Sequence, residues 1–198
     1  MKLPPDFFGR ETVTVARELL GKRLVRNLDG RRLSGLICET EAYVGESDSA
    51  CHASRGRTAR TEVMYGPPGR YYVYLIYGMH HMLNIVTATE GAPEAVLIRA
   101  LIPEEGIERM HALRGDAPPA RLADGPGKLC QALAIDRTLN GQPVTGDSLW
   151  LEPGIAVPEG DIRATPRIGI GYATPEDQRR PWRFVLDGQG AGYKVTGR

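Results

Sequence analysis

Apolar residues along this chain occur in short runs between stretches rich in glycine and proline. Short runs of this kind favour strands over long helices. Residues 11–20 are the exception, since their spacing predicts an amphipathic helix with one partly apolar face. Residues 22–28 and 32–43 then predict two strands joined by a turn at Asp29-Gly30, a dipeptide typical of tight hairpins.

The middle of the chain combines a long polar segment with the most apolar one. Residues 44–70 are rich in Gly, Ser, Arg and Pro and predict a loop, and loops of this length inside a domain are usually functional. Residues 71–89 carry no formal charge and approach the length of a membrane span. Their tyrosines, histidines and Gly78 instead predict two buried strands that meet near that glycine. We therefore expect no membrane-spanning helix.

Short elements make up the rest of the chain. The pattern predicts helices over residues 104–114 and 128–135, and strands over residues 95–101, 149–151, 167–171 and 183–186, with a surface loop over 115–124. Because strands dominate and the helices are clustered, the expected class is α+β. We expect a single compact domain over residues 1–198, with a curved, mostly antiparallel sheet, open and barrel-like, flanked by helices.

Composition excludes several classes of protein. The 198 residues are 41% hydrophobic, and 25 Lys and Arg face 24 Asp and Glu, which gives a net charge of +1. A disordered chain would be less apolar, and a protein that coats nucleic acid along its whole surface would be far more basic. The three cysteines form no CxxC pair and predict reduced thiols. The first residues show no apolar signal segment, so we expect a cytoplasmic protein.

Positive charge is concentrated in the long loop. Residues 51–70 hold four arginines against one glutamate, a larger excess than that of the whole chain. Guanidinium groups bind phosphate in a bidentate manner, so the loop fits either a phosphate contact or an ordinary solvated surface. The arginines are Arg55, Arg57, Arg60 and Arg70.

Two carboxylates and an aromatic residue share one face of a predicted strand. Side chains alternate along a strand, which places Glu39, Glu41 and Tyr43 together at its end. An acidic pair beside an aromatic ring fits a general base next to a stacking surface. It also fits a solvated sheet edge.

Four of the eight tyrosines lie within residues 71–77. As a strand, this segment places Tyr72 and Tyr74 on one face and Tyr71 on the other, and it leads into a turn that displays Tyr77 and Met79. Aromatic residues on strands often belong to the core. A tyrosine hydroxyl, however, needs a partner, and exposed aromatic rings beside arginines suit base stacking and insertion into DNA.

Several polar residues interrupt the apolar pattern. Asn84 and Arg99 lie inside predicted strands, where they must find partners, either in a functional site or in a structural ion pair. The segment from Gly125 to Lys128 opens a helix and fits an anion site or a plain helix cap. His52, His80 and His81 show no spacing typical of a metal site, so we expect no metal.

Five segments, in order, resemble the alkyladenine DNA glycosylase family of mammalian type. They are ETEAYVGESDSACH from Glu39, YVYLIYGMHHMLNIV, VLIRAL, GPGKLCQALAI and RIGIG. The resemblance extends from about Phe7 to Phe184. It implies a domain that binds double-stranded DNA, flips a damaged purine (alkylated, deaminated or etheno-bridged) into a pocket and hydrolyses its N-glycosidic bond in base excision repair. It implies no cofactor, and we expect a monomer.

The resemblance also implies roles for individual residues. It places the catalytic base on Glu41, with Arg99 and the main-chain carbonyl of Ile168 holding the nucleophilic water. The base pocket falls on the stacking residues Tyr43, His52 and Tyr74, on Asn84, and on backbone groups of Ala50 and His52; the residues inserted into DNA fall on Tyr77 and Met79. The charge pattern adds Arg55, Arg57, Arg60 and Lys128 as candidate contacts to the DNA backbone, and the pattern gives no role for His80 or His81.

The residue types at these positions limit the chemistry. None of them is a lysine that could form a Schiff base, so a monofunctional glycosylase that leaves an abasic site is expected. An alternative is a non-catalytic nucleic-acid-binding domain that uses the same basic loop and tyrosines. A carboxylate near phosphates would repel them, which speaks against a pure binder. A metal-dependent hydrolase that uses the histidines is a further alternative.

Overall fold

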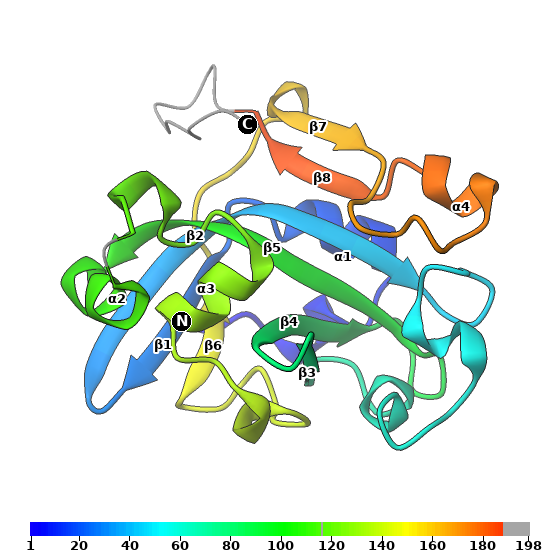
Figure 1. Ribbon diagram of the computed structural model, residues 1–198, viewed down its shortest axis with the longest axis horizontal. Coiled ribbons are helices and arrows are strands. Elements are labelled where there is room, and N and C mark those ends of the chain that lie inside the picture. The colour runs from blue at the N-terminus through cyan, green and yellow to red at the C-terminus, as the bar shows by residue number, and fades with distance from the viewer. Residues whose placement is uncertain (116, 188–198) are drawn as a thin grey trace.

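A long, bent antiparallel sheet organises the computed structural model, which describes residues 1–115 and 117–187 (Figure 1). The strands of these residues are β1 Arg23–Leu28, β2 Arg31–Val44, β3 Tyr71–Ile76, β4 His80–Thr87, β5 Glu94–Glu105, β6 Leu149–Glu152, β7 Ile162–Thr165 and β8 Arg183–Leu186. The helices are α1 Thr12–Glu18, α2 Ile107–Arg114, α3 Pro126–Ala132 and α4 Pro175–Arg179. Six strands follow the order β3-β4-β5-β2-β1-β6, and β8 pairs with both β2 and β7. The sheet is open, and the predicted α+β class is confirmed.

The alternation of side chains gives this sheet two different faces. On β3, Tyr71 and Val73 are buried in the main hydrophobic core, together with residues of α1 and α3 such as Val15 and Leu129. Tyr72, between them on the strand, belongs instead to a smaller cluster under the long loop. The two helices therefore cover the core face, and the opposite face, which we call the site face, is left for the residues that carry chemistry.

Strand β2 holds the sheet together. It pairs with β5 through residues 34–44, with β1 through residues 31–36, and with β8 only through residues 39–41. Between the pairs Ile37–Leu101 and Thr40–Ile98 the register of the ladder with β5 shifts twice, and Arg99 lies in this irregular stretch. Such β-bulges redirect side chains and are frequent beside active sites.

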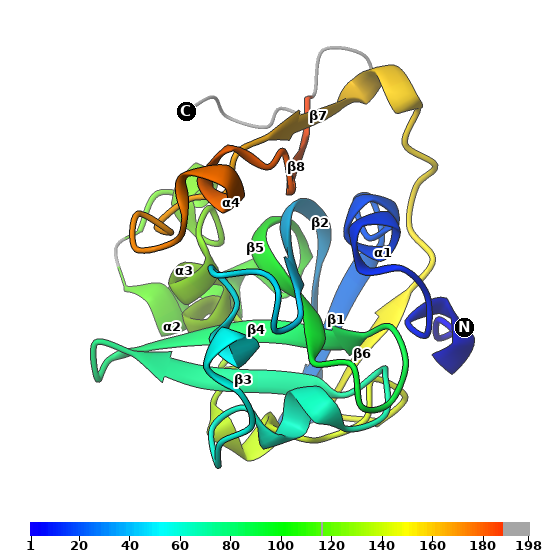
Figure 2. The ribbon, with the colours of Figure 1, turned by 90° about the vertical axis from the view of Figure 1, so that its right-hand side faces the viewer.

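Strands β7 and β8 form a hairpin along the top of the molecule in both views (Figures 1 and 2). The prediction of a strand over residues 167–171 is wrong, because this segment is irregular, with Arg167 drawn into a buried ion pair and Gly169 at a φ of 78°. The strand lies earlier, at Ile162–Thr165. Its mixed polar composition fits an exposed edge strand, which lacks the apolar alternation of a buried one.

Other boundaries also differ from the prediction, and the helix expected over residues 128–135 is α3 Pro126–Ala132. Strand β5 continues to Glu105, and the helix expected from residue 104 begins at Ile107, after Gly106 turns the chain with a φ of 73°. The long loop over residues 44–70 holds two short 3-10 turns, His52–Arg55 and Glu62–Tyr65. Each turn buries one apolar residue and thereby fixes the loop on the sheet.

The uncharged segment over residues 71–89 forms β3 and β4, as predicted. Within the described part of the chain, no helix is long and apolar enough to cross a membrane. The extent of the domain over residues 1–198 stays a prediction, because residue 116 and residues 188–198 lie outside the description.

Candidate active site

One row of directly paired residues crosses the site face. Glu41 on β2 lies opposite Leu97 on β5 and Arg183 on β8. Leu97 lies opposite Asn84 on β4, which in turn lies opposite Tyr72 on β3. Residues paired across neighbouring strands point to the same face, so the register alone brings the carboxylate of Glu41, the amide of Asn84 and the phenol of Tyr72 into one line.

Glu41 is fully buried and has several polar partners. Its Oε1 accepts a hydrogen bond from the backbone N–H of Ile168 at 2.7 Å, and its Oε2 accepts one from the hydroxyl of Tyr43 at 2.8 Å. The guanidinium of Arg99 lies 3.2 Å from the same Oε2. The donors orient the buried carboxylate, and because it is paired, its burial costs far less free energy than the burial of an unpaired charge.

Burial raises the pKa of Glu41 above its usual value, and the charge of Arg99 and the bonds from Ile168 and Tyr43 oppose that rise. Burial beside this carboxylate also raises the pKa of Tyr43 well above its usual value, so its hydroxyl stays protonated and donates. A carboxylate whose pKa is raised accepts a proton more readily, which suits a general base.

Arg99 is held by a second carboxylate. Its Nε donates to Oε1 of Glu39 at 2.8 Å, and the Nε of Arg183 donates to the same oxygen at 2.7 Å. Burial raises the pKa of Glu39, but the Arg183 bond and the charge of Arg99 outweigh burial and lower it. The predicted solvated sheet edge is therefore wrong for Glu39 and Glu41, since both carboxylates are buried and paired.

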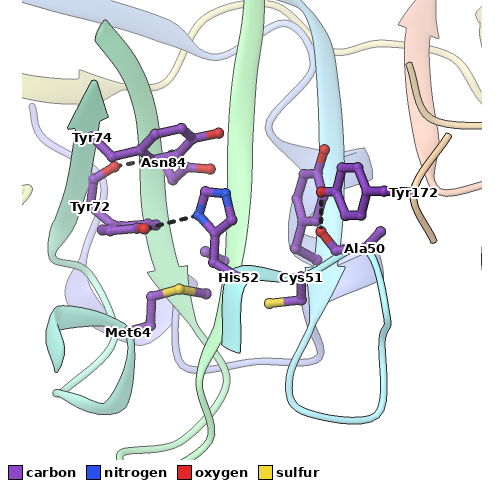
Figure 3. Close-up of a pocket in the computed structure, with 10 residues that line it drawn as sticks. Ala50, Cys51, His52, Met64, Tyr72, Tyr74, Asn84 and Tyr172 are labelled. Atoms are coloured by element: carbon purple, nitrogen blue, oxygen red, sulfur yellow. Dashed lines mark hydrogen bonds between the residues drawn. The ribbon is translucent and has the colours of Figure 1, made fainter. Parts of the chain in front are cut away.

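A pocket of about 310 Å³, counting its open mouth, adjoins this cluster through Tyr43, which lines the pocket and donates to Glu41. Figure 3 shows the side chains that line the pocket. Its size is at the lower end of pockets that hold small molecules. Aromatic residues from the sheet, the long loop and the segment after β7 surround it. The lining residues are Tyr43, Ala50, Cys51, His52, Met64, Tyr72, Tyr74, Asn84, Ala95 and Tyr172.

His52 projects into this pocket from the long loop (Figure 3). Its Nδ1 lies 3.0 Å from the hydroxyl of Tyr72, and its ring meets that of Tyr74 edge-on, with centroids 4.6 Å apart. Burial, with the nearby charges of Arg60 and Arg55, lowers the pKa of His52 to about 4. The imidazole is therefore neutral at physiological pH and presents an aromatic surface without charge.

The polar edge of the pocket is fixed by local bonds. The amide nitrogen of Asn84 donates to the carbonyl of Tyr72 at 3.1 Å. The backbone N–H of Ala50 donates to Asp48 at 3.1 Å, and the carbonyl of Ala50 accepts from the hydroxyl of Tyr172 at 2.8 Å. A carbonyl has two lone pairs, so that of Ala50 can accept a second bond from a molecule in the pocket.

A buried ion pair fixes the segment that reaches Glu41. Arg167 donates to both oxygens of Asp48 and to the carbonyl of Ala42, and its guanidinium lies 4.8 Å from the centre of the Tyr43 ring. Arg167 and Asp48 are both almost fully buried. Since Ile168 follows directly, this pair positions the amide that binds Glu41.

The turn between β3 and β4 presents two large side chains to solvent. Tyr77 is 86% exposed and Met79 is 70% exposed. The turn that joins β3 and β4 lies at one edge of the molecule (Figure 2). Tyr77 has a φ of 52°, which is uncommon for a bulky residue, and Gly78 follows with a φ of 71°. Strain at an exposed aromatic residue is typical of a functional position.

The four candidate backbone contacts have different surroundings. Arg60 lies over the ring of Tyr74 at 4.9 Å, so it stands at the pocket, while Arg55 is exposed beside His52. Arg57 is bound to Glu62. Lys128 is bound to Asp124.

The histidines do not gather into a metal site. Among residues 1–115 and 117–187, no group of three or more His, Cys, Asp and Glu side chains could hold a metal ion. His80 packs against Gly127 at the start of α3, where a β-carbon would lie 3.2 Å from the histidine side chain. The charge of His81 helps to lower the pKa of Asp136, after the hydrogen bonds from Thr138.

Several residues at the site were not among the predicted site residues. Tyr72 shares the strand face of Tyr74, so the alternation could have indicated it. Met64, Tyr172 and Arg183 carry no local signal, because only the folded chain brings them to the pocket or to Glu39. Arg167 stood inside a wrongly predicted strand.

Comparison with known proteins adds independent information. The family model for methylpurine-DNA glycosylase matches residues 6–190. A protein of Methanocella arvoryzae is 56% identical over 92% of this chain and 90% of its own, and one of Myxococcus xanthus is 51% identical over 86% and 83%. A protein of Carboxydothermus hydrogenoformans is 49% identical over 94% and 95%. Each of the three is provisionally named 3-methyladenine DNA glycosylase.

Proposed function

Because the chain belongs to the methylpurine-DNA glycosylase family, we propose that it excises 3-methyladenine and related damaged purines from DNA, with Glu41 as the general base. It is a monofunctional glycosylase, a hydrolase of base excision repair, and the alternative of a non-catalytic binding domain is set aside. The observation that carries the assignment of the base is the buried Glu41 carboxylate, held by the Ile168 amide, the Tyr43 hydroxyl and Arg99 beside an aromatic pocket.

The reaction needs a water molecule on the face of the sugar opposite the departing base. Glu41 takes a proton from this water while the bond between C1′ and the purine nitrogen breaks, and the bonding electrons leave with the base. The sugar passes through an oxocarbenium-like state, which the negative charge of Glu41 stabilises. Arg99 orients the water and keeps the carboxylate ionised. The hydroxide adds to C1′, and an abasic site remains.

The aromatic residues bind the flipped purine. Tyr43, His52 and Tyr74 offer ring faces or edges, and stacking is worth about 1–3 kcal/mol per base. A neutral His52 suits an alkylated purine that carries positive charge, since an imidazolium would repel it. Asn84 on the pocket wall would clash with the exocyclic amine of guanine and so exclude this normal base.

The exposed turn and the basic loop bind the duplex. Flipping a nucleotide costs a few kcal/mol, and less at a damaged base. Tyr77, with Met79 beside it, offsets this cost by filling the vacated place in the stack. Arg55 and Arg60 contact phosphates around the pocket mouth, which helps a protein of nearly neutral net charge to bind DNA.

The variant Glu41→Gln tests the assignment of the base. Glutamine keeps an oxygen that can accept from the Ile168 amide but cannot take a proton. We expect excision of hypoxanthine or ethenoadenine from a duplex oligonucleotide to be lost, with DNA binding retained. Single-turnover reactions followed by alkaline cleavage reveal the abasic sites. The matched control is Glu18→Gln, an exposed carboxylate bound to Arg10. Unchanged excision by Glu41→Gln would remove this residue as the base.

We further propose that the enzyme acts as a monomer on chromosomal DNA in the cytoplasm. Light scattering of the protein, alone and with a damaged duplex, measures its mass in solution. A mass twice that of the 198-residue chain would contradict the first part of the proposal.

A further inference from the structure

Four charged groups form a continuous line that ends at the catalytic carboxylate. Arg183 contacts Glu39, Glu39 contacts Arg99, and Arg99 contacts Glu41, over distances of 2.7, 2.8 and 3.2 Å. Arg183 is contributed by β8, both carboxylates by β2, and Arg99 by the bulge of β5. The charges alternate in sign along this line.

The line is shielded from water. The side chains of Glu39, Arg99 and Arg183 are 6%, 8% and 14% exposed, and that of Glu41 is fully buried. Two positive and two negative charges balance inside this volume. Charges act on one another strongly where water is excluded, so the loss of any one of them changes the potential at the others.

We propose that Glu39 and Arg183 are positioning residues of the glycosylase reaction, which divide the charge of Arg99 between two carboxylates and thereby set the proton affinity of Glu41. Because Arg183 partly neutralises Glu39, Arg99 interacts less strongly with Glu39 and more strongly with Glu41. This inference rests on the proposed role of Glu41 as the base.

The proposal gives opposite signs for two substitutions. Arg183→Gln leaves two carboxylates that share one guanidinium, so the pKa of Glu41 rises. Glu39→Gln leaves Arg99 to Glu41 alone, with Arg183 nearby, so the pKa of Glu41 falls. A purely structural role would lower stability in both variants without moving the pKa in opposite directions.

The other groups that face Glu41 stay the same in both variants. On its own strand this is Tyr43, and on β3 it is Tyr74, whose charged form interacts with Glu41. The segment after β7 adds Arg167 and Tyr172, and the charge of Arg167 is paired with Asp48. Burial raises the pKa of all three tyrosines, so they stay neutral around pH 7.

The test is the pH profile of the single-turnover excision rate on a hypoxanthine duplex. The rate rises with pH as Glu41 loses its proton, and the midpoint of this acidic limb reports its pKa in the complex. We expect Arg183→Gln to move the midpoint up by about one pH unit and Glu39→Gln to move it down by about one unit. The double variant should lie between the two single ones.

Two controls separate charge from shape. Arg183→Lys keeps the positive charge and should leave the midpoint near that of the unmodified enzyme. Arg163→Gln removes an exposed arginine of the same hairpin, whose partner Asp187 lies 3.6 Å away, and should leave the midpoint unchanged. Thermal unfolding of each variant confirms that it is folded.

The outcomes separate this inference from the proposed function. Midpoints that move in the same direction, or not at all, in folded variants overturn the positioning role. If Arg183→Gln fails to fold, Glu39→Gln decides alone, and an upward or absent shift refutes the proposal. Absence of excision by the unmodified protein would instead refute the proposed function.

Discussion

Tyr77 holds a left-handed backbone conformation, with a φ of 52°, while 86% of its surface is exposed. This conformation costs about 1–2 kcal/mol in a residue with a β-carbon. Replacement by glycine removes this cost. Glycine also loses more conformational entropy on folding, which lowers the free energy of unfolding by about 0.5–1 kcal/mol. Taking the middle of each range, we expect Tyr77→Gly to raise the free energy of unfolding by about 0.8 kcal/mol, or the melting temperature by about 2–3 °C.

The same substitution should weaken DNA binding. Loss of one stacked ring costs about 1–3 kcal/mol, which corresponds to an affinity for a damaged duplex about 5- to 150-fold lower. The control variant is Tyr77→Ala, which also loses the ring but keeps a β-carbon at the strained position. Both variants should bind equally weakly, and only the glycine variant should be more stable.

The two measurements are thermal unfolding of the free protein and titration of a duplex that holds one hypoxanthine. If the glycine and alanine variants melt at the same temperature, the strain at Tyr77 is not real. If either variant binds the damaged duplex as tightly as the unmodified protein, Tyr77 is not the inserted residue.

Two further predictions concern the pocket and the basic loop. The pKa of His52 is lowered to about 4, so between pH 6.5 and 4 the unfolded chain binds a proton at His52 more readily than the folded chain does. The contribution of His52 to stability, at most about 3 kcal/mol, is therefore present above pH 6.5 and lost as the pH falls toward 4. In urea unfolding at pH 4.5 and 7, the free energy of unfolding of His52→Gln should differ less between the two pH values than that of the unmodified protein. Arg60→Gln should reduce the slope of log affinity against log salt by about one. Arg57→Gln should reduce it less, because Glu62 already pairs with Arg57, and an equal reduction would contradict the distinction.

The strands that hold the site could be predicted because their signals are local. The turn at Asp29-Gly30 and the alternation along residues 71–76 are contained within short segments, and β1 to β4 are found there. Strand β7 has no such signal, because an exposed edge strand buries too little surface to require an apolar face. The bulge at Arg99 could not be predicted from the sequence either, since it depends on the register between β2 and β5, which are distant in the chain.

The site was predicted unevenly for a related reason. Glu41 and Tyr43 share a strand face and a recognisable segment, so their proximity followed from alternation. Tyr172 is 122 residues from its partner Ala50, and nothing in the adjoining residues indicates that contact. The charge excess of the loop drew attention to Arg60, which lies over the ring of Tyr74, but a count of charges cannot show that Arg57 is already paired.

The order in which the ribosome makes this chain has a consequence for its activity. Glu41 emerges early, yet the amide that orients it lies 127 residues later, and Arg183 lies 144 residues after Glu39. At about 5–20 residues per second, the nascent chain needs about 7–30 s to span the longer distance. A truncated product that ends before Ile168 would retain Tyr77 and most of the pocket but lack the groups that orient its base. Excision activity therefore depends on translation reaching β8, which carries Arg183.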